Sequence, residues 1–89
     1  IDTGHTICAA IKKIKQEGAE KVYTYSTHPV FSKPAPGNIF KLGISEMVVT
    51  DTIPITKNYK KLQALSVASL LSNAVENIHQ NKSVSALFN

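Results

Sequence analysis

The first six residues of the chain, IDTGHT, combine side chains and backbone groups that could hold a phosphate. They lie directly before an amphipathic segment, and the start of a helix leaves backbone N–H groups unpaired beside a partial positive charge. Thr3 and Thr6 add hydroxyl donors, and Gly4 lets the backbone approach a ligand closely. Asp and Thr are also common N-cap residues, so the alternative is a capped helix start that binds no ligand.

Three other segments carry motifs that belong with this loop. They read STHPVFS at residues 26–32, VVTDTIP at 48–54 and SVSALF at 83–88. Together with the loop, they resemble the ribose-phosphate diphosphokinases, also called phosphoribosyl diphosphate synthetases, over essentially the whole chain. The loop pattern is two acids, about two variable residues and then D-T-[GA]-G-T, and many phosphoribosyl enzymes share it. VVTDTIP with a terminal S-x-S-x-L-F is more specific.

The resemblance implies an enzyme that acts on ribose 5-phosphate and ATP. In that family the C1 hydroxyl of ribose 5-phosphate attacks the β-phosphorus of MgATP, which makes phosphoribosyl diphosphate and releases AMP. This chain would supply only the ribose 5-phosphate anchor, and we expect it to be inactive alone, with no catalytic residue or metal ligand and with Mg²⁺ bound mainly outside it. The resemblance assigns the anchor to Asp2, Thr3, Gly4, His5 and Thr6.

Two of the anchor residues have special roles in this reading. Asp2 would repel a phosphate, so we expect it to orient the loop or the ribose. His5 stands where the family usually has glycine. Its backbone N–H is retained, but its side chain occupies space that is normally bare.

The tail resembles the regulatory segment of the family. Ser83, Val84 and Ser85 would lie at a subunit boundary and help to bind phosphate or ADP, in a homo-oligomer built from dimers, such as a hexamer. Isologous contacts recur in such closed assemblies, so one tail can affect every subunit. The alternative is a terminal stretch whose Leu87 and Phe88 pack on the sheet.

Two other functions stay open at this point. One is a non-catalytic synthetase-associated subunit, which keeps the fold and the oligomer contacts without turnover. The other is a true phosphoribosyltransferase, in which C1 is attacked instead of attacking. The preserved D-T-G-x-T loop argues against the first, and the match of the tail to the synthetases argues against the second.

The composition limits the class of partner. The chain has 89 residues, enough for one small domain, and a net charge of +4 in which all ten basic residues are lysine. Nucleic-acid readers rely on arginine for bidentate base contacts, so we expect no nucleic-acid partner and assign the lysines at 12–15 and 57–61 to solvated faces. Without an apolar run that could cross a bilayer or a signal peptide, we expect no membrane partner and a cytoplasmic location. The lone Cys8 is expected to be a small packed thiol.

Apolar periodicity predicts alternating helices and strands. Helices are expected at 6–17, 38–42 and 68–80, and strands at 21–27, 46–50 and 62–67, with a loop at 32–38. The apolar run at 47–49 predicts a strand covered on both faces. This alternation is typical of a parallel α/β sheet. The resemblance makes it a type I phosphoribosyltransferase-like (Rossmann-like) sheet flanked by helices, in which residues 1–89 are the C-terminal part of the C-terminal domain and the first strand, upstream of Ile1, is missing.

The remaining polar and aromatic residues have simpler explanations. We expect the ring of His28, which precedes a proline, to bond to backbone instead of serving as a base. His79, near the end of the last helix, suits the helix dipole. Tyr23 and Tyr25 share one strand face and should pack or contact a subunit. Asp51 either reaches a ligand or forms an Asx turn.

Overall fold

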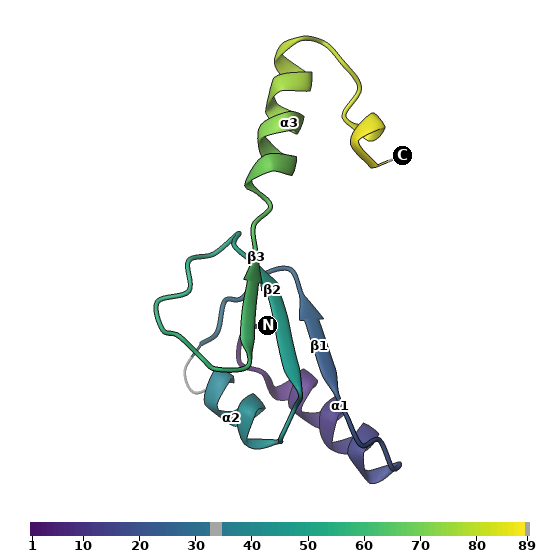
Figure 1. Ribbon diagram of the computed structural model, residues 1–89, viewed down its shortest axis with the longest axis vertical. Coiled ribbons are helices and arrows are strands. Elements are labelled where there is room, and N and C mark those ends of the chain that lie inside the picture. Colours follow the sequence, from purple (N-terminus) through teal and green to yellow (C-terminus); the bar gives the residue numbers. More distant parts are fainter. Residues whose placement is uncertain (33–34, 89) are drawn as a thin grey trace.

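A parallel sheet forms the centre of the chain in a computed structural model that describes residues 1–32 and 35–88. Thr24 pairs with Met47, and Val49 pairs with Ala64. The predicted parallel α/β sheet is therefore confirmed, and the middle strand has the predicted bounds. The strands lie side by side in sequence order (Figure 1) as β1 (Tyr23–Ser26), β2 (Glu46–Thr50) and β3 (Leu62–Leu65).

Helix α1 (His5–Gln16) begins and ends one residue before its predicted bounds. Ile11 faces the sheet and is 2% exposed, whereas Ile14 is 46% exposed. Gly18 follows the end of the helix. At a φ of 101° it adopts the left-handed conformation, and its N–H bonds to the Lys15 carbonyl at 3.1 Å.

Helix α2 (Ala35–Lys41) begins three residues before the start predicted at residue 38. The proline and glycine content suggested a loop at 32–38, of which residues 33 and 34 lie outside the described residues. Pro36 is tolerated in the first helical turn, because the N–H that proline lacks would have no partner there. The Ala35 amide instead donates to the Ser32 carbonyl at 2.8 Å, which fixes the entry into the helix.

One face of the sheet carries the hydrophobic core. Two helices cover this face (Figure 1), and each fully buried aliphatic side chain contributes about 1.5–3 kcal/mol. Cys8 is partly buried against this core, as predicted for a packed thiol. The members of the core cluster with 2% exposure or less are Ile11 of α1, Ile39 of α2, Ile44, and Met47 and Val49 of β2.

The opposite face of the sheet is open, so the prediction that β2 is covered on both faces is wrong. Side chains alternate between the two faces of a strand, and Val48 is only half-buried although both of its neighbours are buried. Beside it, Tyr25 is 73% exposed, and Tyr23 on the same face is 52% exposed. The tyrosines share a face as predicted, but they do not pack into this core.

Helix α3 (Ala68–His79) extends away from the sheet (Figure 1). Its position matches the prediction, and His79 is its last residue. Its apolar stripe is not buried, since Leu71, Val75 and Ile78 are 55%, 67% and 65% exposed. No helix in the described part of the chain has the length and apolar character needed to cross a membrane.

Two of the lysines assigned to solvated faces hold a turn in place instead. Lys15 Nζ donates to the Gly43 carbonyl at 2.9 Å, and Lys61 Nζ donates to the Ile44 carbonyl at 3.1 Å. Gly43, at a φ of 72°, follows the end of α2. These bonds fix the connection from α2 into the buried strand β2.

Thr24 provides a test of this core. It is 7% exposed, and its Oγ1 has no hydrogen-bond partner among residues 1–32 and 35–88. A buried hydroxyl without a partner costs about 1–3 kcal/mol. Thr24→Val replaces that hydroxyl by a methyl group of similar size, so it should raise the free energy of unfolding in urea by about 1 kcal/mol or more.

Thr50→Val is the matched control, because Thr50 Oγ1 donates to the Thr27 carbonyl at 2.6 Å. Loss of this bond should lower the free energy of unfolding by about 0.5–1.5 kcal/mol. A change of the same sign in both variants would contradict this description of the core.

Candidate phosphate-binding site

The N-terminus of α1 has no side-chain cap. Gly4 is the N-cap residue, and the first helical bond runs from the Cys8 amide to the Gly4 carbonyl at 2.9 Å. The amides of His5, Thr6 and Ile7 have no acceptor among the described residues. The alternative of a helix start capped by Asp or Thr is therefore wrong, and three N–H donors are left for an external anion.

Gly4 has a structural role that the sequence did not reveal. Its φ of 83° lies in the left-handed region, and a Cβ there would stand 3.3 Å from Ala35 Cβ and 3.4 Å from Ile39 Cδ1. The side of Gly4 that lacks a Cβ therefore faces α2, whereas the sequence suggested that it would face the ligand. Glycine is required because the loop turns sharply while it packs against a helix.

Asp2 fastens the loop to the segment around residues 28–32. Its carboxylate accepts a hydrogen bond from the Ser32 hydroxyl, and its carbonyl accepts one from the Ser32 amide at 3.0 Å. The Phe31 amide bonds to the Ile1 carbonyl at 3.0 Å, and the Ile1 nitrogen donates to the His28 carbonyl at 2.9 Å. This arrangement fits the expected role of Asp2 in orienting the loop.

The loop forms the wall of an open depression of about 540 Å³. Residues 1–7 and Ala10 line it, and the side chains of Thr3, His5 and Thr6 are exposed. An anion bound here could accept hydrogen bonds from backbone amides and from two hydroxyls. It would also lie at the positive end of the helix dipole. Such a set suits a phosphate, because several hydrogen bonds to charged oxygens can form at once.

The ends of β1 and β2 bring together the motifs at 26–32 and 48–54. His28 Nδ1 lies 2.8 Å from Thr52 Oγ1, so the predicted ring bond to backbone is wrong and the partner is a hydroxyl. Thr50 Oγ1 donates to the Thr27 carbonyl and lies 3.2 Å from Thr52 Oγ1. A short network of hydroxyls therefore joins the two strand ends, and it accounts for His28 without a catalytic role.

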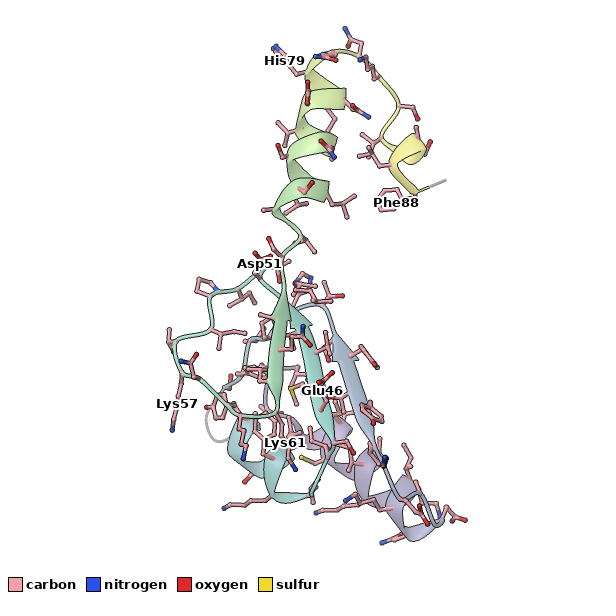
Figure 2. The ribbon with its side chains drawn as sticks, in the orientation of Figure 1. Glu46, Asp51, Lys57, Lys61, His79 and Phe88 are labelled. Atoms are coloured by element: carbon pink, nitrogen blue, oxygen red, sulfur yellow. The ribbon has the colours of Figure 1, made fainter. Side chains whose placement is uncertain are left out.

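Asp51 lies at the junction between the sheet and α3 (Figure 2). Its Oδ1 accepts a hydrogen bond from the Val67 amide at 2.9 Å, which lies beyond the end of the neighbouring strand β3. Of the two alternatives for Asp51, the Asx turn is therefore wrong, because this oxygen bonds to the residue before α3. The Val67 amide, with a smaller contribution from the Ser66 hydroxyl, lowers the pKa of the Asp51 carboxyl from its usual 3.8.

The tail lies apart from the loop. The 3₁₀ turn η1 (Ser85–Phe88) packs on α3, and Figure 2 shows Phe88 beside that helix and away from the strands. The alternative in which Leu87 and Phe88 pack on the sheet is wrong for this reason. Asn77 Nδ2 donates to the Ser83 carbonyl at 2.9 Å, and Ser83 Oγ lies 2.8 Å from Ser85 Oγ.

Two residues that shape the site, Ser32 and Thr52, had no individual role in the predictions from sequence. Ser32 anchors the loop through Asp2, and Thr52 receives the ring of His28. Both residues lie inside the motifs at 26–32 and 48–54, and this position was the sequence signal that could have identified them. Among the described residues, no three His, Cys, Asp or Glu side chains cluster in a way that could hold a metal ion.

Comparison with known proteins points to the same family along the whole chain. The family model of the phosphoribosyl synthetase-associated domain matches residues 1–89. Ribose-phosphate pyrophosphokinases from Haemophilus influenzae, Buchnera aphidicola and Xylella fastidiosa are 44%, 43% and 46% identical over 100%, 99% and 99% of the chain. Pyrophosphokinase is another word for diphosphokinase, so the resemblance found in the motifs is confirmed.

The chain spans less than a third of these relatives, since the matches cover 29%, 29% and 28% of their lengths. Its assignment to their carboxyl-terminal part stays a prediction. The match therefore relates the chain to one part of these longer proteins and does not by itself show that the chain has their activity.

The Asp51 contact predicts a pH dependence. Because the folded pKa lies below the unfolded value, the stabilisation is present above about pH 4 and is lost as the pH falls through the lowered pKa. The Val67 amide resonance should titrate with a midpoint below 3.8. Asp51→Asn should abolish that titration and the associated acid loss of stability. A midpoint at or above the usual value would contradict the assigned hydrogen bond.

Proposed function

The chain belongs to the phosphoribosyl synthetase-associated domain family, and from this premise we propose that it forms the ribose 5-phosphate anchor of a ribose-phosphate pyrophosphokinase. The observation that carries the proposal is the uncapped N-terminus of α1, where three amides have no acceptor among the described residues. The loop that presents them contains the D-T-G-x-T pattern of phosphoribosyl enzymes. The anchor residues are Asp2, Thr3, Gly4, His5 and Thr6.

The 5-phosphate would lie against the amides of residues 5–7. Thr3 and Thr6 would add hydroxyl donors, and Asp2 would hold the loop through Ser32 without touching the anion. Hydrogen bonds to a charged group contribute about 1.5–3 kcal/mol each. His5 contributes its amide, while its side chain is exposed at the rim of the depression.

In the proposed reaction the chain positions the acceptor. The C1 hydroxyl of ribose 5-phosphate forms a bond to the β-phosphorus of ATP, the bond from that phosphorus to the α-phosphate oxygen breaks, and AMP leaves. Fixing the 5-phosphate orients C1 toward ATP, and positioning supplies much of the rate in phosphoryl transfer. ATP, Mg²⁺ and the group that accepts the hydroxyl proton would be held by residues outside this chain.

We assign the longer protein a type I phosphoribosyltransferase-like domain, in which a strand upstream of residue 1 would precede the loop and residues 1–89 would form the carboxyl-terminal part. Its substrates are metabolites of the cytoplasm, which is the location proposed for it. The non-catalytic subunit and the phosphoribosyltransferase are less well supported, because the relatives that match the whole chain are named ribose-phosphate pyrophosphokinase.

We also propose that the longer protein is a homo-oligomer built from dimers, with Ser83, Val84 and Ser85 in a phosphate or ADP site near an interface. Two apolar surfaces support this assembly. The outer face of the sheet exposes Tyr25, and α3 exposes Val75. Parallel sheets are normally covered on both faces, so further protein should cover these surfaces.

The anchor can be tested by calorimetry with ribose 5-phosphate. Thr6→Val removes one hydroxyl donor to a charged phosphate, so it should weaken binding by about tenfold or more. Thr56→Val, in the exposed loop 51–61, is the matched control and should leave the affinity unchanged. Ribose, which lacks the phosphate, should bind to the unmodified chain with no higher affinity than to the Thr6→Val variant. Equal weakening by both valine variants would contradict the anchor.

The tail proposal is tested in the longer protein by removing residues 83–89. Activation by phosphate or inhibition by ADP should change, while the affinity for ribose 5-phosphate stays the same, because the tail and the loop share no contact in the described part of the chain. Steady-state kinetics and sedimentation measure the two effects. An unchanged effector response together with an unchanged oligomer would make the tail a packing element only.

A further inference from the structure

A groove of about 540 Å³ lies between α1 and α2, lined by His5 to Lys12 on one side and by Asn38 to Leu42 on the other. We call it the α1–α2 groove. Thr3 and His5 lie at one end, where the phosphate loop begins, and the helices continue it along their length. The polar and charged residues that line it are Thr3, His5, Lys12, Asn38 and Lys41.

The charge in the α1–α2 groove is not neutralised. Lys12 and Lys41 are exposed, and within residues 1–32 and 35–88 neither makes a salt bridge or a side-chain hydrogen bond. No acidic side chain lines the groove. The other two lysines of α1 differ, because Lys13 pairs with Glu17 at 3.0 Å and Lys15 bonds to a carbonyl.

The spacing of these groups suits an extended anion. His5 and Lys12 are seven residues apart on α1, which is two helical turns or about 10 Å. Lys41 faces the same space from the last turn of α2. A single phosphate cannot contact both ends of such a groove, whereas a linear chain of phosphates can follow it. Lysine ammonium groups are compact point charges that can donate hydrogen bonds to phosphate oxygens in many orientations.

We propose that the α1–α2 groove binds a short linear polyphosphate chain, at a subsite separate from the phosphate loop. The two lysines neutralise its charge, and Asn38 donates hydrogen bonds to its oxygens. Apart from the imidazole of His5, no aromatic side chain lines the groove, so a nucleobase has little surface on which to stack. The ligand is thus recognised by its phosphates alone, whether the chain is inorganic or part of a nucleotide.

Nuclear magnetic resonance titration of the 89-residue chain with inorganic triphosphate tests this subsite. The amide resonances of Lys12, Asn38 and Lys41 should shift together. Lys12→Gln and Lys41→Gln should each weaken binding by about two- to fivefold, as expected for exposed charge pairs, and the double variant by roughly the product. ATP should bind with the same affinity as triphosphate if only the phosphate chain is recognised.

Lys13→Gln is the matched control, because it removes the same charge from the same helix outside the groove. Triphosphate affinity should stay within twofold of the unmodified chain. If Lys13→Gln weakens binding as much as Lys12→Gln, the effect is general charge attraction and the subsite is overturned. A markedly tighter binding of ATP, or equal competition by a single-stranded oligonucleotide, would also overturn recognition of a short phosphate chain.

The subsite and the anchor can fail independently. If triphosphate shifts only the resonances of residues 3–6 and ignores the lysine variants, the groove is overturned and the anchor is untouched. Orthophosphate should move the loop resonances in the lysine double variant as in the unmodified chain. If orthophosphate moves the loop resonances in neither protein while triphosphate still shifts Lys12 and Lys41, the anchor proposal is overturned. The groove proposal then stands.

Discussion

The contact between Gly4 and α2 is the constraint on which the candidate site depends. A side chain at this left-handed residue would be strained and would press on Ala35 and Ile39, so glycine is strongly favoured where α1 begins. Because the cap is a glycine, no side chain satisfies the first amides of the helix. The contact between Gly4 and α2 therefore leaves the first backbone amides of α1 free as hydrogen-bond donors. The bonds between Asp2 and Ser32 hold the loop that precedes these amides.

The core is built on one side of the sheet only. Met47 and Val49 pack under α1 and α2, while Tyr25 and the apolar stripe of α3 stay exposed. A chain of this size buries a smaller share of its surface than a larger domain does, so its stability rests on few side chains. The two uncovered apolar surfaces are consistent with a role inside a longer, assembled protein, as proposed above.

Local patterns predicted the elements well, and tertiary contacts explain the errors. The periodicity of α1 and the apolar run of β2 depend on nearby residues, so their bounds were found to within one residue. The early start of α2 was missed because Pro36 is unfavourable in most of a helix but not in its first turn. The partners of His28 and Asp51 come from segments 16 or more residues away, which no local pattern encodes. The loop motif itself was found by resemblance, whereas the absence of a side-chain cap required the structure.

The most direct test of the anchor is the response of the backbone amides of His5, Thr6 and Ile7 to ribose 5-phosphate, followed by nuclear magnetic resonance. The account predicts that these three resonances shift first and furthest, and that free ribose leaves them in place. If ribose 5-phosphate binds while these amides do not move, or if ribose moves them equally, the helix N-terminus is not the phosphate site and the central claim is contradicted.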